Sequence, residues 1–118
     1  MNNLNSILIE GTVVGDVASK TLPSGSQVCS FVVASDRFNK QDGAIKKEIS
    51  RFDVEAWSRL GQSCVEKLKK GRGVMIVGRL KQDRWTDADG VKRSSVKIVA
   101  EHVEFKPVFN KQLTDKRS

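Results

Sequence analysis

The sequence has little of the chemistry that enzymes use. Among its 118 residues it has one histidine, two cysteines and no tyrosine. His102 has no nucleophile or metal ligand near it in sequence, and Gly71-x-Gly73 precedes a predicted strand, so it fits neither a dinucleotide fingerprint nor a phosphate loop. Asp87 and Asp89 are better explained by turn formation than by acid-base catalysis. We therefore expect no enzymatic activity, no catalytic residue, no metal site and no cofactor.

The chain also lacks paired cysteines and long apolar runs. Cys29 and Cys64 stand far apart without CxxC spacing, each inside an apolar pattern, which indicates buried, reduced thiols. No apolar run approaches the roughly 20 residues that a membrane helix needs. The first residues, MNNLNSILIEG, lack the charged start and long apolar core of a signal peptide. We expect a cytoplasmic, nucleoid-associated protein that does not bind membranes.

Positive charge is abundant instead. There are 21 lysines and arginines against 14 aspartates and glutamates, a formal net charge of +7. This balance favours acidic partners, either nucleic acid or an anionic lipid surface. The lipid alternative is weaker because the one helical pattern has an apolar stripe too narrow for a membrane-surface helix. The length suits a single domain with its own core.

Five segments show the patterns of strands, and one shows the pattern of a helix. The strand at 48–57 divides cleanly by parity, which places Phe52 in the core and exposes Trp57. Cys29, Phe31 and Val33 form the core side of the second strand. A helix begins at the cap Ser58 and its apolar spacing lasts until Gly71. The expected strands cover residues 7–14, 27–35, 48–57, 74–82 and 94–103.

Three strands, a short helix and two strands are the element order of an OB-fold. The expected fold class is therefore all-β with one short helix, a five-stranded Greek-key barrel that commonly binds oligonucleotides. A β-grasp or another small α+β fold could use similar elements. We expect the OB domain to cover residues 1–106 and a short, flexible, basic segment to cover 107–118.

Two segments between the strands carry rings among cations. The stretch 78–93, GRLKQDRWTDADGVKR, places Trp85 beside an Asp89-Gly90 turn and predicts a basic hairpin. Residues 36–47 lack a clear apolar alternation and are expected to form a polar, basic loop that contains Phe38. Phosphates need cations and unpaired bases need stacking partners, so both segments suit single-stranded nucleic acid. The alternatives are an ordinary basic hairpin and a Phe38 ring folded back onto the sheet.

Over roughly residues 5–104, the chain resembles the bacterial single-stranded DNA-binding proteins of the SSB family. The resemblance is carried by NSILIEGTVVGD, SGSQVCSFVVASD, FDVEAWSRLGQSCVEKLKKG and VMIVGRLKQDRWTDADGVKR, in that order. It implies an OB-fold that assembles, usually as a homotetramer, and that wraps single-stranded DNA without reading its sequence in replication, recombination and repair.

The resemblance also implies site residues. The family's base-stacking positions fall on Phe38, Trp57, Trp85 and Arg51. Arg51 stands where an aromatic residue is common, although a guanidinium plane can also stack on a base. The cations expected to neutralise phosphates are Lys40, Lys46, Lys47, Arg59, Lys70, Arg79, Lys81 and Arg84.

The chain departs from the family at its end. Family members typically finish with a flexible linker and an acidic tip that recruits replication and repair proteins, whereas this chain ends DKRS. We therefore expect single-stranded DNA as the main partner. Replication and repair proteins are a weaker expectation, because the acidic tip that recruits them is missing. The alternative functions are a primosomal-type replication protein or an RNA-binding OB-fold protein, either acting as an assembly module.

Overall fold

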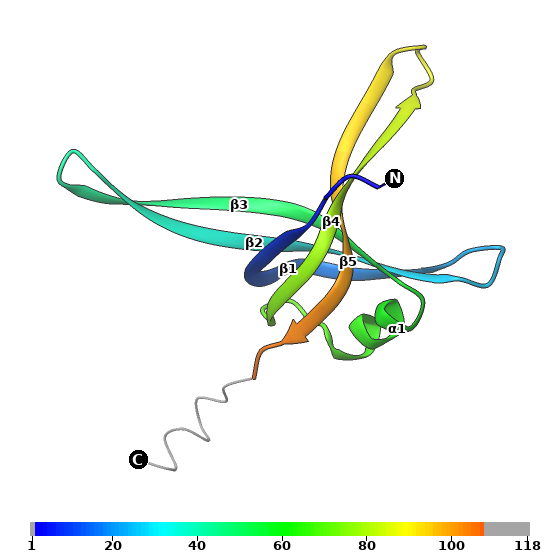
Figure 1. Cartoon of the computed structure of the whole chain (residues 1–118), viewed down its shortest axis with the longest axis horizontal. Helices are drawn as coiled ribbons and strands as arrows, with labels where there is room; N and C mark the ends of the chain where they lie inside the picture. Colours follow the sequence, from blue (N-terminus) through cyan, green and yellow to red (C-terminus); the bar gives the residue numbers. More distant parts are fainter. Residues whose placement is uncertain (1, 108–118) are drawn as a thin grey trace.

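A computed structural model of the chain describes residues 2–107. The five strands close into a barrel in the order β1-β2-β3-β5-β4 (Figure 1), in which only β3 and β5 run parallel. This confirms the predicted class, an OB-fold that is all-β with one short helix. The elements are β1 (Ile7–Thr21), β2 (Gln27–Gln41), β3 (Ala44–Trp57), α1 (Ser58–Lys67), β4 (Gly73–Thr86) and β5 (Lys92–Phe105).

The core lies inside the barrel and under α1. Cys29, Phe31 and Val33 are at most 3% exposed, as the parity of the second strand predicts. Both cysteines are free and buried, which confirms the expected thiols. Burial is the main cause that raises the pKa of the Cys64 thiol, to about 12, so this thiol stays protonated at neutral pH.

Three hairpin arms extend from the barrel in different directions (Figure 1), formed by β1–β2, β2–β3 and β4–β5. The predicted loop at 36–47 is wrong, because the β2–β3 ladder runs without a register shift from Val28↔Trp57 to Gln41↔Ala44. The first strand does not end at residue 14 either. It continues to Thr21 past an irregularity between Val14 and Ala18. These extensions are held by backbone hydrogen bonds. Their sequences lack the apolar alternation that would predict a strand.

Two further predictions need correction. Phe52 lies on the interior side of β3 with Val54 and Ala56, but it is 38% exposed because the hairpin is leaving the barrel there. Ser58 does not cap the helix. Trp57 holds the N-cap position without a side-chain hydrogen bond, and Ser58 turns the chain into α1 with a φ of 57°.

The end of the helix and the end of the chain also differ from expectation. The helix stops at Lys67 rather than near Gly71, and the amide of Gly71 instead donates to the carbonyl oxygen of Val13 at 2.7 Å. Of the predicted C-terminal segment, residues 108–118 lie outside the described residues. Within residues 2–107, no helix combines the length and apolar character needed to cross a membrane.

Candidate nucleic-acid interface

The register of the ladders decides which side chains share the outer surface of the barrel. Val54 of β3 and Ile98 of β5 are paired and buried, so the next pair, Glu55 and Val99, lies on the outside. Because side chains alternate along a strand, the same side of β2, β3, β5 and β4 can be followed from this pair through the ladders. We call this side the outer face.

All four predicted stacking residues lie on the outer face. Trp57 and Arg51 share it with Glu55 on β3, and Phe38 faces Lys47 across the β2–β3 ladder. Val99 pairs with Arg79 on β4, and Trp85, which pairs with Arg93, lies on the same side of that strand as Arg79. The structure therefore places these residues on one side of the sheet. Phe38 belongs to β2 and Trp85 to β4, and the β2–β3 and β4–β5 arms extend in different directions (Figure 1).

The two arm rings are open to solvent. Phe38 is 66% exposed and does not fold back onto the sheet, and Trp85 is 49% exposed. Trp57 is partly buried where β3 meets α1, whereas Arg51 is exposed. An exposed ring on a projecting hairpin has no core to pack into, so these rings are available to a ligand.

The predicted phosphate contacts are divided between the two sides of the arms. Lys40 and Lys47 lie on the same side as Phe38, whereas Lys46, opposite Asn39, lies on the other side. The register brings only part of the predicted set together on the β2–β3 arm.

The remaining cations are spread more widely. Arg79 and Lys81 share the outer face with Trp85, and Arg84, opposite Ser94, does not. Arg59 lies near the start of α1, and Lys70 lies in the turn between α1 and β4. The structure therefore does not gather all eight cations into one groove.

Within residues 2–107, two of these eight cations are paired with carboxylates. Lys47 Nζ lies 3.5 Å from an oxygen of Asp36, and Lys81 Nζ lies 3.8 Å from one of Asp83. Such exposed pairs contribute little to stability. They do, however, reduce the net charge that these two lysines offer to a phosphate.

Lys97 is a central cation that the sequence reasoning missed. Its Nζ lies 3.0 Å from Glu55 Oε2 and also contacts Asp83 Oδ2, so it joins β3, β5 and β4 on the outer face. Hydrogen bonds to Asp83 and Glu55 raise the pKa of Lys97, and the bond from Lys97 lowers the pKa of the Asp83 carboxyl. Sequence spacing gave no sign of this cluster, because its members come from three strands.

We expect this cluster to make the protein less stable in acid. The folded pKa of Asp83 lies below its unfolded value of about 3.9. Its stabilising effect is therefore present above that value and lost as the pH falls through the folded pKa. Thermal melts should show that Lys97→Met lowers the melting temperature more at pH 7 than at pH 2.5. An equal loss at both pH values would contradict this role.

The β2–β3 arm carries two further exposed apolar residues on its outer face. Ile45 is 75% exposed and Ile49 is 48% exposed, and both share their side with Phe38. The sequence analysis missed them because it treated part of this arm as a loop. Both have the same parity as Arg51 and Trp57 on β3, and this shared parity was the signal that could have found them.

The β4–β5 turn is organised by an acidic side chain. Asp87 Oδ1 accepts hydrogen bonds from the amides of Asp89 and Val91, each at 2.9 Å, and Oδ2 accepts one from Arg93. Gly90 has a φ of 79°, as the predicted turn requires. These bonds lower the pKa of the Asp87 carboxyl, that of the Val91 amide having the largest effect. The Asp87 carboxylate therefore stabilises the turn.

A closed five-stranded barrel with one short helix, whose hairpins hold exposed rings beside cations, defines an OB-fold protein. No group of histidine, cysteine and acidic residues in the described part of the chain could hold a metal ion. The chain belongs to the single-strand binding protein family, whose model matches residues 4–106. The family is defined by binding rather than by a reaction, which agrees with the expectation that the chain is no enzyme.

Relatives and solved structures agree with this assignment. The chain is 38% identical over 101 residues to the single-stranded DNA-binding protein of Helicobacter hepaticus, covering 85% of this chain and 59% of that protein. It is 37% identical over 101 residues to the protein of that name from Aquifex aeolicus, covering 85% of this chain and 68% of that protein. The match thus spans about three fifths to two thirds of these relatives.

Two solved structures show the same fold. One is the Plasmodium falciparum SSB in complex with ssDNA, with a TM-score of 0.81 at 21% identity, covering 91% of this chain and 98% of that chain. The other is a deletion mutant of the single-stranded DNA binding protein from Thermus aquaticus, with a TM-score of 0.78 at 23% identity. It covers 88% of this chain and 51% of that chain.

Proposed function

We propose that the protein binds single-stranded DNA without regard to sequence, and coats and protects it during replication, recombination and repair. The observation that carries this proposal is the exposure of Phe38 and Trp85 on the outer face, each beside cations. The names of the relatives support the ligand. Replication and repair proteins are the partners that such a role would bring.

In this mechanism, the bases stack on Phe38, Trp57 and Trp85, and the guanidinium plane of Arg51 supplies a further stacking surface. Every base has a π-face, so stacking tolerates any sequence. Nearby cations, of which Lys40 and Arg79 have no carboxylate within 4.0 Å in residues 2–107, neutralise the phosphates. Affinity should fall with salt, with a log-log slope of about −0.7 for each phosphate contacted.

Tryptophan emission tests this proposal directly, because the chain has only Trp57 and Trp85. Adding oligo(dT) at low salt should change the emission, and the single variants Trp57→Phe and Trp85→Phe should show which ring responds. Unchanged emission with no measurable binding would refute the proposal. U oligomers of equal length provide the comparison, since tighter binding to RNA would instead support the RNA-binding alternative.

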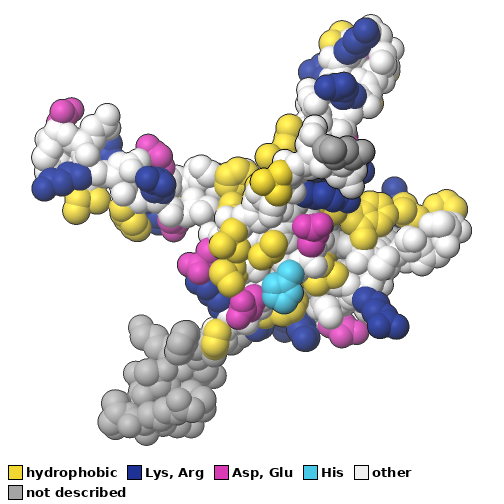
Figure 2. Space-filling model, viewed as in Figure 1, with side chains coloured by type: hydrophobic (Ala, Val, Ile, Leu, Met, Phe, Trp, Pro, Cys, Tyr) yellow, Lys and Arg dark blue, Asp and Glu magenta, His cyan; other side chains and the backbone are white. Residues whose placement is uncertain are grey.

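We also propose that the protein acts as a homo-oligomer, a tetramer in the family's usual form. The exterior of β1, β4 and β5 is a candidate contact surface, because the ladders place Leu8 beside Val77, and Val77 beside His102. Leu8 is 68% exposed. Figure 2 shows hydrophobic side chains gathered around the single histidine on this part of the barrel. A second copy of the same surface would bury them.

A further inference from the structure

The β4–β5 arm, which carries Trp85, is joined to the rest of the barrel by few backbone bonds. The ladder between β1 and β4 ends at the pair Ile7↔Gly78. On the other edge of the arm, the parallel ladder between β3 and β5 contains two residue pairs within residues 2–107. Beyond these ladders the arm is a two-stranded ribbon, which is marginally stable by itself. The direction of the arm (Figure 1) therefore depends on what holds its base.

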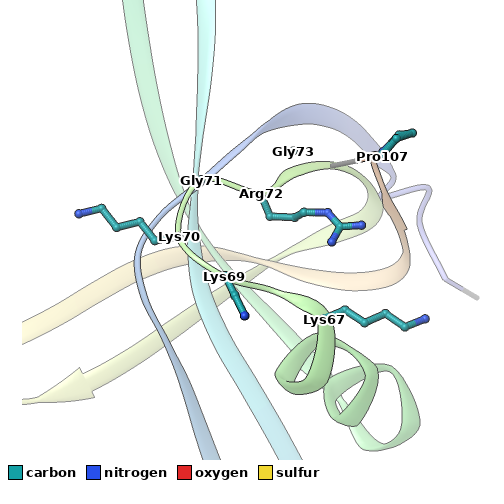
Figure 3. Close-up of a pocket in the computed structure, with 7 residues that line it drawn as sticks. All are labelled: Lys67, Lys69, Lys70, Gly71, Arg72, Gly73 and Pro107. Atoms are coloured by element: carbon teal, nitrogen blue, oxygen red, sulfur yellow. The ribbon is translucent and has the colours of Figure 1, made fainter. Parts of the chain in front are cut away.

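The arm leaves the barrel at a bend in β4. The β4–β5 register shifts between Val77 and Gly78, an irregularity of the kind that bends a strand and increases its twist. A Cβ at Gly78 would collide with the carbonyl oxygen of Val99, so the two backbones approach closely there. The beginning of β4, in contrast, is held at the turn after α1 (Figure 3), where the Gly71 amide donates to the carbonyl oxygen of Val13. Thus β4 has one fixed end and one projecting end, with the bend between them.

The side chain of Asn5 is bonded to the arm just past this bend. Its Nδ2 donates to the carbonyl oxygen of Leu80 at 2.8 Å, and its Oδ1 accepts a hydrogen bond from the Leu80 amide at 2.9 Å. The register of β1 with β4 would place Leu80 opposite Asn5, two positions beyond Ile7↔Gly78. The side-chain amide therefore takes the place of a backbone peptide group and adds one more pair to the ladder. We call these two bonds the Asn5 clamp.

The clamp and an ion pair hold opposite edges of the base of the arm. Asn5 holds the β4 edge, whereas Lys97 joins β5 to Glu55 of β3 on the other edge. Trp85 stands five residues beyond Leu80 on β4. At about 3.3 Å per residue, the ring is roughly 16 Å farther out along the strand. Because displacement grows with distance from the base, a small change of angle there moves the ring relative to the barrel.

We propose that Asn5 is a positioning residue for Trp85. The clamp sets the direction in which the arm leaves the barrel, and with it the placement of this ring relative to Trp57 and Arg51 on the outer face. A single strand that stacks on both parts then meets a surface already in place. This inference rests on the proposed function, because it concerns how one stacking residue is presented to the bases.

Measurements without DNA test the clamp itself. In Asn5→Ala, the Leu80 amide should exchange with solvent about 3- to 10-fold faster, as expected for the loss of one hydrogen bond, whereas the hydrogen-bonded amide of Val13 should exchange as in the parent. In the Trp57→Phe background Trp85 is the only tryptophan, and Asn5→Ala should lower its emission anisotropy. Unchanged exchange at Leu80, or unchanged anisotropy, would overturn the inference.

A double-mutant cycle tests whether Asn5 acts through Trp85. Asn5→Ala should weaken binding of a dT oligomer by about 3- to 10-fold in the parent, and should have little further effect in Trp85→Ala, where no ring is left to position. A merely structural change would act in both backgrounds, so equal losses would contradict the role, as would no loss in the parent.

The matched control for the clamp is Asn3→Ala, at an exposed asparagine of the same segment, which should bind DNA and exchange its Leu80 amide like the parent. Because the clamp bonds are exposed to water, their loss should leave the fold intact, and thermal melts verify this. A parent protein that binds no oligomer would refute the proposed function. The exchange and anisotropy measurements would still decide whether Asn5 holds the arm.

Discussion

Removing the two exposed rings together should weaken binding to every single-stranded DNA sequence, by about 30-fold to more than 10⁴-fold at low salt. Each stacking residue contributes about 1 to 3 kcal/mol on replacement by alanine, and about 1.4 kcal/mol corresponds to a factor of ten. Phe38 and Trp85 stand on separate arms, so their effects should add. Titrations of Phe38→Ala/Trp85→Ala with dT, dC and dA oligomers measure the loss.

The fold should survive this double substitution, because neither ring belongs to the buried core. Val91→Ala is the matched control, since Val91 is also 49% exposed at the β4–β5 turn but has no ring to stack. The control should bind like the parent. Loss of affinity for only one base composition would contradict sequence-blind stacking, and an equal loss in the control would point to the shape of the hairpin instead.

Placing a charge on the exterior of β1 should break the proposed assembly. Leu8→Arg would put a guanidinium into an apolar contact between copies, where an unpaired charge is strongly unfavourable. We expect the mass in solution to fall from that of a tetramer to that of a dimer or monomer. Light scattering coupled to size-exclusion chromatography measures this change.

The control for assembly is Val65→Arg, a similar change at an exposed apolar position on α1. It should leave the mass in solution unchanged. If Leu8→Arg had the same mass as the parent, the surface around Leu8 and His102 would not be the contact between copies. A parent protein that is monomeric at every concentration would instead refute the oligomer itself.

The element order and the core side of the strands could be predicted because both depend on local pattern. Alternation identified Cys29, Phe31 and Val33 as interior residues, and they are buried. The same rule put Phe52 on the interior side, but it could not tell that the strand there has already left the barrel. Burial depends on which neighbouring elements cover a residue. The pattern of one strand does not show where those neighbouring elements end.

The candidate site was only partly predictable for the same reason. Resemblance and parity selected Trp57 and Trp85, which the structure places on one face. The Lys97 cluster and the exposed Ile45 and Ile49 were missed. These features depend on which strands lie side by side and on how far the hairpins project.

The sequence by itself determined the strand and helix order, the interior side of the second and third strands, the positive charge and the family. Side-chain alternation and helical spacing act over a few residues, so they can be read without a partner. Only the tertiary structure decided which rings and cations share the outer face. That depends on the parallel pairing of β3 with β5 and on the antiparallel register of β4 with β5, which join residues distant in sequence. It also decided that Lys97 is held by Glu55 and Asp83, which come from two other strands.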